Sequence, residues 1–110
     1  MTYKMFLDDI RNPEWVYPSQ DVNGWMVCRS VAEALTVIAD LGWPEWISFD
    51  HDLGHSDDPT GYDLAWELVE QDLDHQSMPD NFSFSVHSAN VVGSENIRNL
   101  LNNYLAQKSK

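Results

Sequence analysis

Acidic side chains stand in two short groups, each directly after an apolar stretch of the chain. Asp8 and Asp9 follow one such stretch near the start, and Asp50 and Asp52 follow another near the middle. If both stretches are neighbouring parallel strands, their carboxyl ends meet at one edge of a sheet and bring the carboxylates close together. Like charges at that separation do not all stay ionised unless a cation neutralises them. Hard oxygen ligands favour Mg²⁺ or Mn²⁺, with Ca²⁺ also compatible, so we expect these acids to bind a divalent metal.

Two histidines belong to the same predicted edge. His51 lies between the acids of the second group, and His87 ends a later stretch in which apolar and polar residues alternate. Histidine exchanges protons near neutral pH, so we expect His51 and His87, together with Asp50, to be the catalytic residues. Taken alone, each histidine would more often be a strand-end residue that only hydrogen-bonds a backbone group.

Cationic and neutral donors complete the predicted site. Arg11 follows the first acidic pair, and Ser88 and Asn90 follow His87. The arginine guanidinium can bind two oxygens of one phosphate, and hydroxyl and amide groups offer further hydrogen bonds. We therefore expect Arg11, Ser88 and Asn90 to bind the substrate. For Arg11, the alternative is an ion pair with the surrounding acids.

Strands and helices alternate along the chain and must position these residues. The first two strands are separated by residues 11–24, whose two prolines and one glycine predict an irregular loop or a single turn. The hydrophobic pattern predicts strands at 3–7, 25–29, 46–49 and 82–87, and helices at 30–41, from 60 to about 73, and from 93 onward.

This alternation predicts a parallel sheet, because parallel neighbours need long, right-handed crossover connections. We expect one α/β domain over residues 1–110, with strand order 2-1-3-4. The expected architecture is a three-layer, flavodoxin-like sandwich whose sheet is truncated to four strands, since the sequence stops where a fifth would begin.

The net charge of −12 limits the possible partners. Only 6 residues are Lys or Arg, against 18 Asp or Glu. This balance excludes the basic stripe that binds duplex nucleic acid, but a metal could offset the repulsion of a phosphorylated small molecule or an RNA end. Cys28 is the single cysteine, and the chain has neither a signal-peptide pattern nor a long apolar run. We expect a cytoplasmic protein without membrane contact, and the oligomeric state stays open.

At these residues the sequence resembles the receiver domains of two-component signalling. Receivers carry an acidic pair after their first strand, a phosphoacceptor aspartate after the third and a Ser/Thr-Ala pair after the fourth. The corresponding residues here are Asp8-Asp9, Asp50 and Ser88-Ala89. The lysine of the fifth receiver strand has no counterpart, and a helix between the first two strands is not evident. Both departures weaken an expectation of phosphorelay signalling.

The sequence is more similar to a receiver-derived family, the cyclic-phosphate-processing receiver-like proteins. The similarity lies in the segments LDDIRNP (7–13), SFDHDLG (48–54), TGYD (60–63) and VHSAN (86–90). These segments occur in this order over nearly the whole chain. The resemblance implies a receiver-like fold and the handling of cyclic phosphates, such as those at RNA ends or in nucleotides.

The leading hypothesis is a metal-dependent phosphoesterase that opens a cyclic phosphate. One alternative is a receiver-like phosphoacceptor or binding module without turnover, in which Asp50 accepts a phosphoryl group. The missing lysine and the added histidines count against it. Another alternative is an acidic interaction protein, such as a decoy or inhibitor, with no active site. That reading explains the charge but leaves the clustering of acids and histidines to chance.

Overall fold

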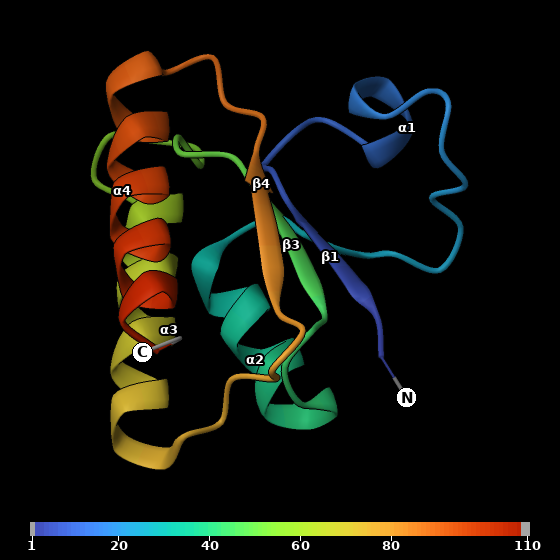
Figure 1. Ribbon diagram of the computed structural model, residues 1–110. Helices are drawn as coiled ribbons and strands as arrows, with labels where there is room; N and C mark the ends of the chain where they lie inside the picture. Colours follow the sequence, from blue (N-terminus) through green and yellow to red (C-terminus); the bar gives the residue numbers. More distant parts are fainter. Residues whose placement is uncertain (1, 109–110) are drawn as a thin grey trace.

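Strands and helices alternate along the chain in the computed structural model, which describes residues 2–108 (Figure 1). None of the helices within these residues combines the length and the apolar composition that crossing a membrane requires. The elements are β1 (Lys4–Leu7), α1 (Pro13–Val16), β2 (Met26–Cys28), α2 (Val31–Leu41), β3 (Trp46–Phe49), α3 (Gly61–His75), β4 (Ser83–Val86) and α4 (Val91–Lys108).

The strands form one parallel sheet in the order β2-β1-β3-β4, which confirms the predicted topology. The last residues of the strands are in register: Leu7 pairs with Cys28 on one side and Phe49 on the other, and Phe49 pairs with Val86. Because the strands end at the same level, the residues that follow them start from a common edge of the sheet. Parallel strands therefore place the candidate site residues together.

The helices α2, α3 and α4 all lie on one face of the sheet (Figure 1). Alternate residues of β1 and β3 point toward them, since successive strand side chains face opposite sides. The apolar sides of the helices complete this core, as their spacing predicts. Its fully buried members include Met5, Leu7, Ile47, Phe49, Leu64, Leu68, Ile97 and Leu101.

The opposite face of the sheet has a much thinner cover. The predicted single turn is present as α1, and residues 17–25 continue from it without a regular element. The rings of Tyr17, Trp25 and Trp46 contact one another with centroids 5.1–5.5 Å apart, and the Lys4 ammonium lies 5.5 Å from both tryptophan rings. The third layer of the sandwich is thus one helical turn, a loop and an aromatic cluster, because the prolines prevent a longer helix.

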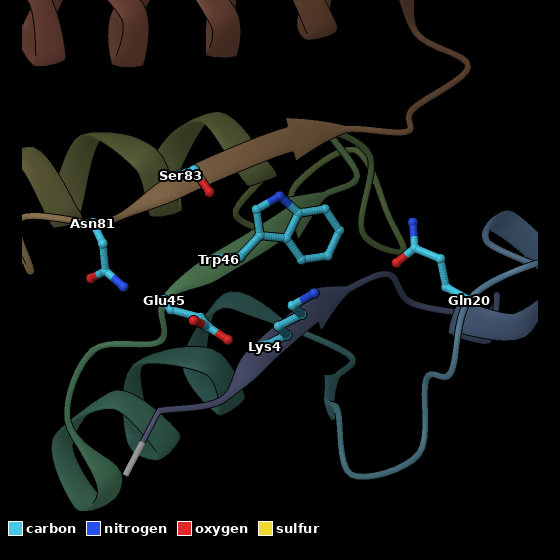
Figure 2. A pocket seen from close by; sticks show the side chains of 6 residues that line it. All are labelled: Lys4, Gln20, Glu45, Trp46, Asn81 and Ser83. Carbon is cyan, nitrogen blue, oxygen red and sulfur yellow. The ribbon is translucent and has the colours of Figure 1, made fainter.

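A cavity of about 290 Å³ opens on this thinly covered face. Figure 2 shows that Lys4, Trp46 and Ser83 from three adjacent strands line it. These are the first residues of β1, β3 and β4. The cavity therefore lies at the amino end of the strands, away from the acidic residues.

Two helix boundaries differ from the sequence-based prediction. The helix expected to begin at 93 begins at Val91, because Asn90 caps it: the Asn90 Oδ1 accepts from the Gly93 N–H at 2.9 Å. The helix expected to end near 73 continues to His75. Its start is as predicted, since the side chains of Thr60 and Asp63 form a reciprocal capping box.

Candidate functional site

Backbone hydrogen bonds carry the sheet one residue beyond the strands and fix three site residues. The N–H of Asp8 donates to the Cys28 carbonyl at 3.0 Å, and that of Asp50 donates to the Leu7 carbonyl at 2.9 Å. The N–H of His87 donates to the Phe49 carbonyl, also at 2.9 Å. The backbones of Asp8, Asp50 and His87 are therefore held in register, so these residues lie side by side at the edge of the sheet.

Three of the four predicted metal ligands come together in what we term the acidic cluster, Asp8, Asp9 and Asp50. One carboxylate oxygen from each lies within 4.8 Å of the others. Asp8 is fully buried and Asp50 is 5 % exposed, whereas Asp9 is half-buried. Asp52 lies outside the acidic cluster, and its side chain is 65 % exposed. Its position three residues beyond the end of β3 places it on the rim of the site.

Asp8 is the most heavily hydrogen-bonded member of the acidic cluster. Burial alone would raise its pKa. The backbone N–H groups of Arg11 and Ile10 donate to Oδ1 at 2.8 and 2.9 Å, and Nε2 of His87 lies 3.0 Å from Oδ2. These interactions outweigh burial and hold the pKa of Asp8 below its ordinary value, so this carboxylate is ionised at neutral pH.

Asp50 has the opposite electrostatic character. Burial raises its pKa, and the negative charge of Asp8 adds to the increase, although a hydrogen bond from the Ser88 side chain opposes it. A second negative charge at this position is therefore costly without a cation. Three convergent carboxylates, two of them buried, form the donor set that Mg²⁺ or Mn²⁺ prefers. The residues present thus fit a divalent metal.

His87 lies behind Asp8 and not at the surface of the site. Its side chain is 3 % exposed, and its ring stacks on Phe6 with centroids 4.5 Å apart and an interplanar angle of 5°. Nδ1 lies 2.6 Å from the Ser48 hydroxyl, while Nε2 contacts Asp8. Burial lowers the pKa of His87, although the Asp8 carboxylate opposes the shift. The sequence predicted that His87 exchanges protons with substrate, but this enclosure favours a role through Asp8.

His51 lies on the other side of the site, against the start of α4. Its Nδ1 is 2.8 Å from the Asp52 carboxylate, and this hydrogen bond holds the pKa of Asp52 below its ordinary value. The Asn90 amide donates to the same carboxylate at 3.3 Å. A Cβ added to Gly93 would stand 2.3 Å from the His51 ring, so the ring packs directly on the helix backbone. Asn90 therefore has two structural contacts: it hydrogen-bonds Asp52 and it caps α4. Its contact with substrate stays a prediction.

Arg11 forms the ion pair with a surrounding acid that the sequence offered as the alternative to phosphate binding. Its Nε lies 3.7 Å from the Asp8 carboxylate, and its Nη1 donates to the His87 carbonyl at 3.1 Å. The guanidinium has five N–H donors, so these contacts leave capacity for a phosphate. Its side chain is 34 % exposed and borders a cavity of about 220 Å³. Asp9, Asp50, Asp52, Ser88 and Asn90 also line this cavity.

Sequence reasoning did not identify Arg29 as a site residue. Its guanidinium donates to the backbone carbonyls of Asp8 and Arg11 and to the Asn12 side chain, at 3.2, 2.5 and 2.6 Å. These bonds fix the loop that carries the first acidic pair. The available signal was an arginine at the last position of a predicted strand, in a chain with 6 Lys or Arg residues.

Comparison with known proteins gives one family match. The model of the family described as the cyclic-phosphate processing Receiver domain matches residues 3–103. No curated protein matches the chain. Among solved structures, NtrX from Brucella abortus has a TM-score of 0.49 and 14 % sequence identity, over 99 % of this chain and 28 % of that chain. The chain thus spans about a quarter of the length of that protein.

Proposed function

The chain belongs to the cyclic-phosphate processing receiver family, and we propose on that basis that it is a metal-dependent phosphoesterase that opens cyclic phosphates. The substrates we propose are cyclic phosphates at RNA ends or in nucleotides. The observation that supports the proposal most strongly is the convergence of Asp8, Asp9 and Asp50 beside a cavity that Arg11 borders. The family match alone does not identify a reaction. The arrangement of three carboxylates beside Arg11 offers the metal ligands and the phosphate donor that a metal-dependent phosphoester reaction requires.

Asp8, Asp9 and Asp50 would hold the metal, Mg²⁺ or Mn²⁺, with Asp52 close by on the rim. A divalent ion there would supply the positive charge that draws a phosphate into an acidic site and activates water for attack. Two of these three carboxylates, Asp8 and Asp50, are buried. Asp9 is anchored separately, since its Oδ2 accepts from the Gly54 N–H at 3.0 Å.

Arg11 and Ser88 would bind the non-bridging oxygens of the phosphate. Both line the cavity next to Asp50. Arginine offers paired N–H donors. The Ser88 hydroxyl, two residues beyond β4, donates its one O–H to Asp50 and would turn it to the phosphate when a metal ion takes over the Asp50 charge. Donors that are fixed before substrate arrives stabilise the charge that develops on phosphoryl oxygens without further reorganisation.

Ring opening requires two proton movements. Water adds to phosphorus, one phosphorus–oxygen ester bond breaks, the water loses a proton and the departing ribose oxygen gains one. We assign this exchange to His51, whose side chain is 17 % exposed and whose Nδ1 contacts Asp52. A carboxylate on one ring nitrogen fixes the tautomer and leaves the other nitrogen for proton transfer. His87 contributes by supporting Asp8.

Phosphorus NMR of a nucleoside 2′,3′-cyclic phosphate tests the proposal. The purified protein should convert it to a monoester with Mn²⁺ or Mg²⁺, and a chelator should stop the conversion. Asp50→Asn should abolish turnover, whereas the matched control Asp40→Asn, at an exposed position of α2, should leave it unchanged. If neither this nucleotide nor a panel of larger cyclic phosphates is opened with any divalent metal, the enzyme proposal is wrong.

The same preparations separate the alternatives. A phosphoacceptor would show a mass increase of one phosphoryl group after treatment with a small phosphoryl donor, and Asp50→Asn would lose it. An acidic interaction protein would show neither turnover nor adduct. The enzyme proposal requires turnover without a stable adduct.

A further inference from the structure

Side-chain hydrogen bonds connect the thinly covered face of the sheet to the acidic cluster. The Tyr17 hydroxyl lies 2.7 Å from Ser48 Oγ and 2.8 Å from Ser85 Oγ. Ser48 Oγ lies 2.6 Å from Nδ1 of His87, and Nε2 of His87 lies 3.0 Å from Oδ2 of Asp8. We name Tyr17, Ser48, His87 and Asp8 the polar track. It joins a residue of the irregular segment after α1 to a proposed metal ligand.

Chemistry fixes the direction of the hydrogen bonds in the polar track. An ionised Asp8 only accepts, so Nε2 of His87 carries the proton. A neutral ring then offers Nδ1 as an acceptor, and the Ser48 hydroxyl donates to it. The Ser48 oxygen in turn accepts from the Tyr17 hydroxyl. Each donor therefore points toward Asp8, and each step sets the orientation of the next.

Packing holds every member of the polar track in place. Ser48 and Asp8 are fully buried, and the His87 ring stacks on Phe6. The Tyr17 ring is held by Trp25 and Trp46, each with its centroid 5.5 Å away. The aromatic cluster thus aims a hydroxyl from an irregular segment at the polar strand residues beneath it. No buried side-chain nitrogen or oxygen in residues 2–108 lacks a hydrogen-bond partner.

We propose that Tyr17 and Ser48 are positioning residues of the acidic cluster: through the His87 ring they hold Oδ2 of Asp8 in the orientation that binds a divalent metal. This inference rests on the proposed metal site and extends it to residues that do not touch the metal. Partners of metal ligands fix ligand orientation and commonly control affinity. In the polar track, His87 is the direct partner of Asp8, and Ser48 and Tyr17 in turn hold His87.

The test compares Tyr17→Phe and Ser48→Ala with the matched control Tyr3→Phe. Tyr3 also donates one hydroxyl hydrogen bond, to the Gly42 carbonyl at 2.6 Å, but it lies outside the polar track. Mn²⁺ affinity is measured by calorimetry on each intact chain. Nitrogen NMR of the His87 ring, without metal and at constant pH, reports which nitrogen carries the proton and whether the other accepts a hydrogen bond. Hydrogen exchange of the ring N–H reports how firmly it is held.

The polar track predicts that wild type shows a proton on Nε2 that exchanges slowly. Ser48→Ala should weaken Mn²⁺ binding about 10-fold, the lower end of the range for direct partners of metal ligands. Tyr17→Phe, one hydrogen bond further from Asp8, should weaken it by about 3-fold or more. Both should shift the Nδ1 resonance and speed exchange of the Nε2 proton. Tyr3→Phe should leave affinity, resonance and exchange as in wild type.

Three results would overturn the inference: unchanged affinity and ring resonances in both variants, an equal loss in Tyr3→Phe, or a wild-type ring without a proton on Nε2. If Tyr17→Phe does not fold, Ser48→Ala decides. If wild type does not bind Mn²⁺, the metal site and with it the positioning role are wrong. If Mn²⁺ binds and the variants behave as expected but no cyclic phosphate is opened, only the proposed reaction fails.

Discussion

Asp8 and Asp50 belong to one acidic cluster, yet their pKa values shift in opposite directions. Burial acts to raise both. For Asp8, donors from Arg11, Ile10 and His87 outweigh burial, whereas Asp50 receives less support and faces the charge of Asp8. Ionising Asp8 therefore costs little free energy. Ionising Asp50 costs more, and a bound metal ion would reduce that cost.

The first prediction is that Asp50→Asn stabilises the metal-free protein. A raised folded pKa contributes stability below the unfolded value of 3.8, and this contribution is lost as pH rises through the folded value. At neutral pH the ionised Asp50 thus opposes folding, and a neutral amide removes the repulsion. Thermal unfolding with chelator at pH 7 should show Tm several degrees higher, since about 1 kcal/mol shifts Tm by about 4–8 °C in a small domain. A lower Tm would show that the Asp50 charge is already compensated.

The second prediction is that Asp8→Asn destabilises the metal-free protein. A lowered folded pKa contributes stability above the unfolded value of 3.8, and this contribution is lost as pH falls through the folded value. Asparagine keeps one acceptor oxygen but loses the charge that attracts the donors. We expect a loss of about 1–3 kcal/mol, as for other buried hydrogen-bonded groups. Urea unfolding at pH 7 measures it, and the variant and wild type should converge as pH falls below 3.8 and through the folded pKa of Asp8. A loss that is constant with pH would contradict the assigned cause.

The third prediction is that Mn²⁺ stabilises the protein through the acidic cluster. A ligand at about 100 times its dissociation constant stabilises the native state by about 2.7 kcal/mol. Titration with Mn²⁺ should therefore raise Tm, and Asp9→Asn should remove most of the increase because it deletes one of three converging carboxylates. Asp40→Asn, which changes the net charge equally, should retain the increase. Equal loss in both variants would mean that the ion binds by overall charge alone.

The sequence was sufficient to predict the topology because the fold repeats one simple pattern. Apolar stretches followed by amphipathic helices indicate parallel strands, and strand ends then identify Asp8, Asp50 and His87 as neighbours. The backbone hydrogen bonds of these three residues confirm that the register of the strands alone brings them together. Residues whose position follows from the sheet are predictable in this way.

Residues outside the sheet register were not predictable. Tyr17 comes from an irregular segment, and its contact with Ser48 depends on packing against Trp25 and Trp46. The burial of His87 depends on Phe6 from another strand. Similarly, the last helix was expected to begin at Gly93. The position of Gly93 inside the first turn follows from the Asn90 cap, whereas its contact with the His51 ring is encoded by no local pattern.

The last prediction concerns that contact. Gly93→Ala should lower turnover without weakening Mn²⁺ binding, because the new Cβ would stand 2.3 Å from the His51 ring, while the acidic cluster is formed by other residues. Alanine normally stabilises a helix relative to glycine by about 1 kcal/mol. Overpacking costs about 1–3 kcal/mol, so here we expect a net loss of stability or no gain.

Asn96→Ala, at an exposed position of the same helix, serves as the control and should keep full turnover. Steady-state kinetics on the cyclic phosphate that wild type opens measures the effect, and calorimetry measures Mn²⁺ affinity. If Gly93→Ala is more stable than wild type and equally active, the His51 ring has moved freely, and its assignment to proton exchange at a fixed position is wrong.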